Sequence, residues 1–262
     1  MENESKFEEY KINGKIYNIN VFETANSKND YYLLGYLLGD GGLNKATHKR
    51  KARLFITSTE KYIIEFFRNS YQPDSIINSR IPVNNTRNIV SKIESHRFTF
   101  SSKFEKTFKK YGILDIKENR TFHNIKKEMF PSFLLGLFDA DGHFSWGKRK
   151  DRNRLWCAFG ITHSSFNMLI KLQKILLEQY EIPTSINQKS DERCYVLKTG
   201  SLIMNEKLLK ILYSAKPTVF NKTKYNNCNK FLDKLKSYDY DKHKSKRQSG
   251  RILSENANKK RF

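Results

Sequence analysis

The stretch "LLGLFDADGHF", residues 134–144, is an apolar run that ends in two aspartates and a glycine. A second run of the same type, "LLGYLLGDGGL", occupies residues 33–43. The last aspartates of the two runs, Asp40 and Asp141, stand 101 residues apart (141 − 40). A duplicated apolar run that ends in Asp-Gly indicates an internal repeat. An internal repeat is identified before individual helices and strands are assigned, because it sets the overall fold.

Similar segments follow the two aspartates in the same order. Each aspartate precedes a basic cluster and then an alternating apolar segment that ends at Thr57 or Thr162, which predicts a strand. An amphipathic helix, a turn marked by Pro73 or Pro183, a further strand and a last helix complete each half. We therefore predict an α+β fold in which two pseudo-twofold αββαββα units contain two antiparallel sheets.

The repeat also divides the chain into segments. The expected segments are an N-terminal extension at 1–28, a first repeat at 29–113, a linker at 114–132, a second repeat at 133–235 and a basic tail at 236–262. Within the extension, Asn13-Gly14 between alternating apolar residues is typical of a small hairpin. The tail is polar and basic, and we expect it to be mobile or to become ordered on a polyanion.

The two apolar runs carry small residues at helical spacing. Gly35 and Gly39 are four residues apart, and Gly136 and Ala140 repeat that spacing, so each pair lies on one helix face. A glycine inside a helix costs about 1 kcal/mol relative to alanine. Two runs that both accept this cost predict helices that pack against each other through these small faces.

Asp40 and Asp141 then end the two helices side by side. A helix C-terminus already carries roughly half a negative charge, so a carboxylate there is unfavourable by about 0.3–1 kcal/mol. Bound divalent cations would reverse this balance, because carboxylates and carbonyls are the oxygen ligands that Mg²⁺ prefers. The alternative is that Asp-Gly only ends a helix and begins a turn, and the duplication favours the metal site.

The chain is strongly basic, with 49 Lys and Arg against 27 Asp and Glu and a formal charge of +22. This charge favours a polyanionic partner. No apolar run approaches the roughly 20 residues that span a bilayer. The three cysteines form no CxxC pair, which suits a reducing compartment. We expect an intracellular protein of a bacterium or a phage-infected cell, with the mitochondrion as the alternative.

The nonapeptides "LLGYLLGDG" and "LLGLFDADG" resemble the two motifs of a single-chain LAGLIDADG homing endonuclease, and the similarity extends over roughly residues 29–230. This resemblance implies that two four-stranded sheets form a DNA-binding saddle and that the motif helices form the central interface. It also implies a monomer that makes double-strand breaks in a long, asymmetric DNA target across the minor groove, leaving 3′ overhangs.

The resemblance implies the metal site residue by residue. The implied metal ligands are the carboxylates of Asp40 and Asp141 and the backbone carbonyls of Gly39 and Ala140. Mg²⁺ is the expected cofactor; Mn²⁺ should substitute for it, and Ca²⁺ should bind without supporting cleavage. Asp139 fits the earlier acidic position of the motif, whereas Leu38 occupies that position in the first half.

Other catalytic positions follow from the same resemblance. Ser58 and His163 follow the strand-ending threonines and would order or activate water, since imidazole titrates near neutral pH. Lys117 and Lys222 follow the last helix of each half and would neutralise charge in the transition state. The competitors in the second half are Lys216 and Lys224.

Basic side chains of the predicted sheets and their loops are the candidates for DNA contacts. Strand alternation puts every other side chain on one face, and a β surface can enter the major groove. The candidates are Lys49, Arg50, Lys51, Arg53, Arg87, Lys92, Arg97, Lys148, Arg149, Arg152, Arg154, Lys189 and Arg193. For any one of these residues, a solvated charge is the competing interpretation.

Two other functions fit the same scaffold. An RNA maturase that helps its own intron to splice would also use basic tails. A non-catalytic DNA-binding regulator would have no need for paired aspartates, and it would bind with strong salt dependence but without metal-dependent cutting. The retention of Asp40 and Asp141 favours the endonuclease.

Overall fold

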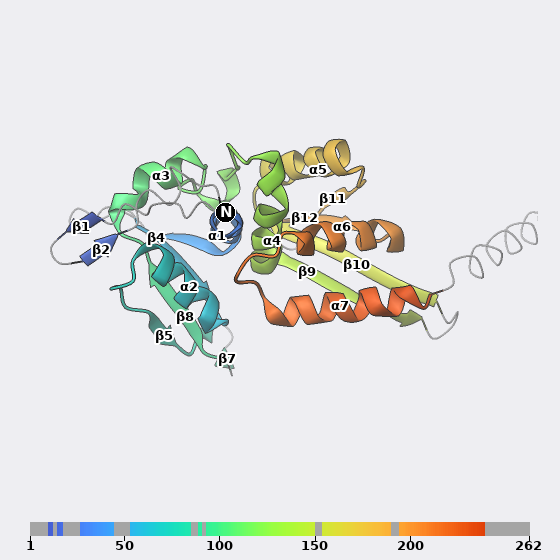
Figure 1. Cartoon of the computed structure of the whole chain (residues 1–262), viewed down its shortest axis with the longest axis horizontal. Helices are drawn as coiled ribbons and strands as arrows, with labels where there is room; N and C mark the ends of the chain where they lie inside the picture. The colour runs from blue at the N-terminus through green and yellow to red at the C-terminus, as the bar shows by residue number, and fades with distance from the viewer. Residues whose placement is uncertain are drawn as a thin grey trace, which may run out of the picture.

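Two helices form the centre of the molecule. In the computed structural model, α1 (Lys28–Asp40) and α4 (Phe130–Asp141) lie side by side, with the rest of each half on its own flank (Figure 1). The structure describes residues 10–12, 15–17, 27–44, 53–84, 89–90, 93–149, 154–189 and 194–238. The predicted duplicated α+β fold with two antiparallel sheets is confirmed.

The first half contains the sheet β3-β4-β8-β5. Its elements after α1 are β3 (Gly41–Asn44), β4 (Arg53–Ser58), α2 (Lys61–Tyr71), β5 (Asn78–Arg80), β8 (Ser95–Thr99), the 3-10 turn η2 (Ser102–Phe104) and α3 (Glu105–Lys110). A short pair that the pattern did not predict, β6 (Val83–Asn84) and β7 (Ile89–Val90), lies between β5 and β8 in sequence. Ahead of the repeat, β1 (Tyr10–Ile12) and β2 (Lys15–Tyr17) pair antiparallel on either side of Asn13-Gly14.

The second half repeats this arrangement with the sheet β9-β10-β12-β11. Its elements after α4 are β9 (Gly142–Arg149), β10 (Arg154–His163), α5 (Phe166–Tyr180), β11 (Ser185–Gln188), β12 (Tyr195–Thr199) and α6 (Leu202–Ser214). Two 3-10 turns, η3 (Lys117–Asn119) and η4 (Lys127–Met129), lie between the halves. The strand orders of the two sheets correspond, as expected for a pseudo-twofold pair.

One helix, α7 (Lys222–Lys236), extends beyond the predicted αββαββα unit. It packs along the edge strand β9 (Figure 1). The indole N–H of Trp146 donates to both Asn227 oxygens at 3.1 and 3.2 Å, and the buried Phe231 contacts the Phe144 and Trp146 rings. The helix was missed because Cys228, Phe231 and Leu235 are its only buried residues.

The helix pair is in contact through its glycines. A methyl group on Gly35 would stand 2.8 Å from Leu137 N, and one on Gly136 would stand 2.9 Å from Tyr36 N. Such distances leave no room for a side chain, so the two backbones touch. Residues 31–39 of α1 are all buried, as expected for a helix that is enclosed on every side. The predicted packing through small residues is confirmed.

Steric crowding explains why a glycine follows each motif aspartate. Each motif helix passes directly into a strand at the glycine, Gly41 or Gly142, without an intervening loop. A Cβ on Gly41 would lie 3.2 Å from the carbonyl carbon of Leu37, and one on Gly142 would lie 2.7 Å from the Cα of Phe138. Glycine therefore lets the chain turn away at the residue after each aspartate. No helix within the described ranges is long and apolar enough to cross a membrane.

Candidate active site

Asp40 and Asp141 meet where the motif helices end. The carboxylate of Asp141 lies beside Gly39, with Oδ2 3.2 Å from the place a Cβ would take there. Burial, followed by repulsion from Asp141, raises the pKa of Asp40 to about 6. Burial also raises the pKa of Asp141. The structure thus brings the two predicted metal-binding carboxylates together across the helix interface.

Lys117 approaches this pair from η3. Its Nζ lies 3.8 Å from Asp141 Oδ2, and its side chain is 42% exposed. The positive charge of Lys117 lowers the pKa of both aspartates, against the effect of burial. Within the described residues, Asp141 Oδ2 is buried and has no hydrogen bond. One predicted lysine therefore has an accessible amine beside the aspartates.

In the second half, the amine of Lys222 does not face the end of its motif helix. It lies over the ring of Tyr62, 5.2 Å from the ring centroid. Two residues further on, Lys224 Nζ donates to the carbonyls of Phe138, Asp139 and Gly142 at 2.7–2.8 Å. Of the lysines considered from the sequence, Lys224 is the one that caps α4.

Arg120 is a site residue that sequence reasoning missed. Its side chain is 1% exposed, and its Nη1 donates to Gly41 O at 2.6 Å and to Leu38 O at 3.3 Å. Its Nε donates to Asp115 O at 3.1 Å. Burial lowers the pKa of Arg120 to about 10, and the charge of Asp141 opposes that shift. Arg120 therefore caps α1 in the way that Lys224 caps α4.

Asp139 connects three segments. Its Oδ2 accepts hydrogen bonds from the Tyr32 hydroxyl at 2.9 Å and from the Asn221 N–H at 2.7 Å. Burial raises its pKa to about 6. These contacts tie α4 to α1 and to the start of α7. Leu38, at the matching position of the first half, is a buried core residue, so the two motifs differ at this position in structure as well as in sequence.

Ser58 and His163 both fix the turn from a strand to a helix. Ser58 Oγ accepts from the Tyr36 hydroxyl at 3.0 Å and from Glu60 N at 3.1 Å. His163 Nδ1 accepts from Ser165 N at 2.9 Å, which leaves Nε2–H to face Leu38 O at 3.4 Å. Burial lowers the pKa of His163 to about 4, so the ring is neutral. Both ring nitrogens are engaged, and this geometry does not favour His163 as a base for water.

Part of the predicted DNA surface is described. The candidates Lys49, Arg50, Lys51, Arg87, Lys92, Arg152 and Arg193 lie outside the described residues. In the first sheet, the Arg97 guanidinium stacks 3.6 Å above the Phe55 ring and donates to Asn44 at 2.7 Å. The exposed Arg53 pairs with Asn44 in the neighbouring strand.

The second sheet presents Arg154 and the 39% exposed Trp156 on alternate positions of β10, with Arg149 opposite Arg154. Lys148 pairs with the buried Leu155 across the strands. It therefore lies on the face of the sheet that packs against the core, at the end of its strand. Lys189 follows β11 and is exposed. Five of the six described candidates therefore lie on an open sheet face or at a strand end near it.

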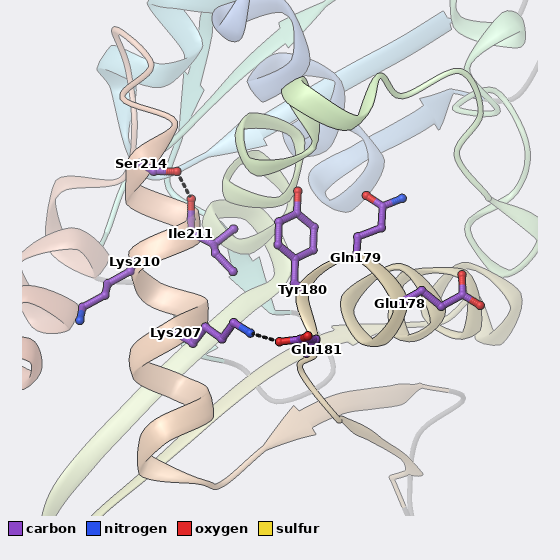
Figure 2. Close-up of a pocket in the computed structure, with 8 residues that line it drawn as sticks. All are labelled: Glu178, Gln179, Tyr180, Glu181, Lys207, Lys210, Ile211 and Ser214. Atoms are coloured by element: carbon purple, nitrogen blue, oxygen red, sulfur yellow. Dashed lines mark hydrogen bonds and ion pairs between the residues drawn. The ribbon is translucent and has the colours of Figure 1, made fainter.

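A pocket of about 560 Å³ lies elsewhere, between the end of α5 and α6 (Figure 2). Its lining residues are Glu178, Gln179, Tyr180, Glu181, Lys207, Lys210, Ile211 and Ser214. Lys207 pairs with Glu181 at 3.0 Å, and Lys210 pairs with Glu206 at 2.7 Å. Its charged side chains therefore have ion-pair partners, some of them outside the lining, and no predicted site residue lines it.

Comparisons with known proteins give a family match in the second half and a likeness of fold over both halves. Residues 131–214 match the family model described as the LAGLIDADG-like domain. The resemblance seen in the two motifs is therefore confirmed, by the family model in the second half and by the fold over both halves. The sequence matches no curated protein.

Three solved structures show the likeness of fold. The LAGLIDADG meganuclease I-AabMI bound to uncleaved DNA has a TM-score of 0.52 at 17% identity, covering 79% of this chain and 91% of its own. The LAGLIDADG homing endonuclease I-GzeII in complex with its DNA target has a TM-score of 0.54 at 13% identity, covering 82% and 94%. I-SmaMI bound to an uncleaved DNA target with calcium ions has a TM-score of 0.52 at 15% identity, covering 78% and 89%.

Proposed function

We propose that the protein is a site-specific homing endonuclease that makes metal-dependent double-strand breaks in DNA. The observation that carries this proposal is the meeting of Asp40 and Asp141 at two helix C-termini, where burial opposes the ionisation of both carboxyls and repulsion from Asp141 further opposes that of Asp40. A structural role alone gives no reason to keep two carboxylates there. The fold shared with DNA-bound meganucleases supports the proposal.

The residues present suit a divalent metal ion. Asp40 and Asp141 supply carboxylates, and Gly39 and Ala140 supply carbonyls next to them. Arg120 and Lys224 donate to neighbouring carbonyls rather than to those of Gly39 and Ala140. Within the described ranges, no three His, Cys, Asp or Glu side chains could hold a metal together. Water and phosphate oxygens would complete the shell, as is common for Mg²⁺. When bound, Mg²⁺ or Mn²⁺ would supply the Lewis acidity for hydrolysis, whereas Ca²⁺ would hold DNA uncut.

The side chains around the aspartates would position the phosphodiester and neutralise its charge. Lys117 has an accessible amine 3.8 Å from Asp141 Oδ2, so it can reach a phosphate oxygen at the mouth of the site. A cation there stabilises negative charge that develops in the transition state. Each half supplies one aspartate, so each would help to cut one strand across the minor groove, leaving 3′ overhangs.

The sheet faces would read an asymmetric target. The first sheet presents Arg97 stacked on Phe55, whereas the second presents Arg149, Arg154 and an exposed Trp156. Arginine is suited to guanine edges in the major groove. Because the two faces carry different side chains, the half-sites need not be related by symmetry. Both motifs lie in one chain, so we also propose that a monomer cuts both strands.

The test is cleavage of a supercoiled plasmid that carries the DNA flanking the gene's insertion point, with Mg²⁺. The wild-type protein should linearise the plasmid, and Asp40→Asn and Asp141→Asn should not. The exposed Lys230→Met on α7 is the matched control. Linearisation by either aspartate variant at the wild-type rate would refute the metal assignment.

The cleavage assay, together with measurements of DNA binding and of intron splicing, separates the alternatives. Salt-sensitive DNA binding without cutting in Mg²⁺ would point to a non-catalytic regulator. Acceleration of intron splicing by the protein, measured on the intron RNA, would point to a maturase.

A further inference from the structure

Two cations, the buried Arg120 and the partly buried Lys224, occupy equivalent places in the two repeats. Arg120 stands ten residues after Lys110, the last residue of α3 (120 − 110). Lys224 stands ten residues after Ser214, the last residue of α6 (224 − 214). Each side chain returns to the C-terminal end of the motif helix in its own half.

The contacts of both cations bracket the motif aspartates. Arg120 donates to Leu38 O and Gly41 O, on either side of Asp40. Lys224 donates to the carbonyls of Phe138, Asp139 and Gly142, on either side of Asp141. Each cation therefore binds the backbone on both sides of the point where the motif helix passes into a strand. We call these two segments, residues 38–41 and 138–142, the aspartate corners, because each contains one motif aspartate.

Electrostatics gives these cations a second effect. The two helix ends add roughly half a negative charge each to the two carboxylates. Arg120 and Lys224 each bind carbonyls on both sides of one aspartate, so each places its positive charge at the helix end where the carboxylates lie. Burial of a cation is unfavourable by itself, and carbonyl oxygens and neighbouring carboxylates compensate for it.

We infer that Arg120 and Lys224 are positioning residues: internal counter-cations that hold the two aspartate corners in place and offset the aspartate charges when no metal is bound. This role goes beyond DNA cleavage and requires no DNA. Its test can therefore fail while the proposed endonuclease activity stands, and the reverse is also true.

The test is a double-mutant cycle on the full-length protein, followed by thermal unfolding in EDTA at pH 7.5. The four proteins are wild type, Lys224→Met, Asp40→Asn/Asp141→Asn and the triple variant. Lys224→Met should lower the Tm of the wild type by about 5 °C or more, because it removes charge-assisted hydrogen bonds to buried carbonyls. In the Asp→Asn background, the loss should be less than half as large, because the charge to be offset has gone.

Several controls make the outcome decisive. Lys230→Met, an exposed lysine on the same helix, should leave Tm unchanged in both backgrounds. Arg120→Met should repeat the coupled loss, and Arg120→Lys should restore part of it by keeping the charge. If Lys224→Met lowers Tm equally in both backgrounds, Lys224 acts only as a helix cap and the inference is overturned. The inference is also overturned if Lys224→Met does not lower Tm at all. If Lys224→Met is insoluble, a soluble triple variant supports the inference and an insoluble one contradicts it.

Discussion

At the scale of a residue, Asp40 shows how a candidate metal ligand can lower the stability of the metal-free folded protein. Its carboxylate is largely buried at a helix C-terminus beside Asp141, and its pKa is raised to about 6. The unfolded chain has an ordinary aspartate pKa of about 3.9. Between these values, the folded protein binds more protons than the unfolded one, so the contribution of Asp40 to stability falls as pH rises.

Asp40→Asn should therefore stabilise the metal-free protein above about pH 6. The free energy of unfolding should rise by on the order of 2–3 kcal/mol at pH 7.5, since one pKa unit corresponds to about 1.4 kcal/mol. The advantage should shrink toward zero near pH 4, where the wild-type carboxyl is protonated. Urea unfolding in EDTA across this range measures the difference, and a difference that does not vary with pH would contradict the assignment.

Gly136 tests the close approach of the helices. Gly136→Ala should destabilise the protein by about 3 kcal/mol or more, the upper end of the range for overpacking. The added Cβ would meet the Tyr36 backbone, which cannot rotate away, and this outweighs the gain of about 1 kcal/mol in helix propensity. Gly200→Ala is the control, because its Cβ would be 3.8 Å from the nearest atom, Cys157 O. Equal unfolding midpoints for the two variants would mean that the helices do not touch there.

At the scale of elements, α7 connects the edge of the second sheet to the site. Phe231→Ala should destabilise the protein by about 3–5 kcal/mol, as for other buried phenylalanines. The ring packs against Phe144 and Trp146, and the helix that it anchors carries Lys224. Urea unfolding followed by tryptophan fluorescence measures the loss, with Lys230→Met as the exposed control. A loss below about 1 kcal/mol would show that α7 is not held by this packing.

The sequence predicted the elements whose signals are local. Small residues at helical spacing indicated the helix contact at Gly35 and Gly136, and alternation indicated the paired sheets. Helix α7 gave a weak signal because its apolar stripe has three buried residues. Arg120 gave none, since the carbonyls it binds lie 79 and 82 residues away. His163 could be placed at a strand end, but its buried neutral state depends on contacts that only the fold supplies.

At the scale of the whole molecule, the two halves of the site are not equivalent. Lys117 stands seven residues after α3 (117 − 110), and the matching position seven residues after α6 (221 − 214) is Asn221. Asn221 is the N-cap of α7, and its side chain accepts from Lys224 N. In the first half, the 42% exposed Lys117 lies beside Asp141, whereas in the second half the amine of Lys224 is bound to three backbone carbonyls.

This asymmetry predicts unequal cutting of the two DNA strands. On a target labelled at either 5′ end, the strand served by Lys117 should be nicked first. Lys117→Met should slow that strand by roughly 100-fold, the usual scale for loss of one charge-stabilising group, with a smaller effect on the other strand. Single-turnover cleavage on a sequencing gel resolves the two rates. Equal slowing of both strands would show that Lys117 serves the halves alike.

The central claim is that Asp40 and Asp141 share divalent ions over the helix interface. The most direct measurement is anomalous scattering from Mn²⁺ in crystals of the protein with its DNA target. We predict anomalous peaks within about 2.5 Å of carboxylate oxygens of both aspartates, and their loss in Asp40→Asn/Asp141→Asn. Bound Mn²⁺ that contacts neither aspartate would contradict the claim.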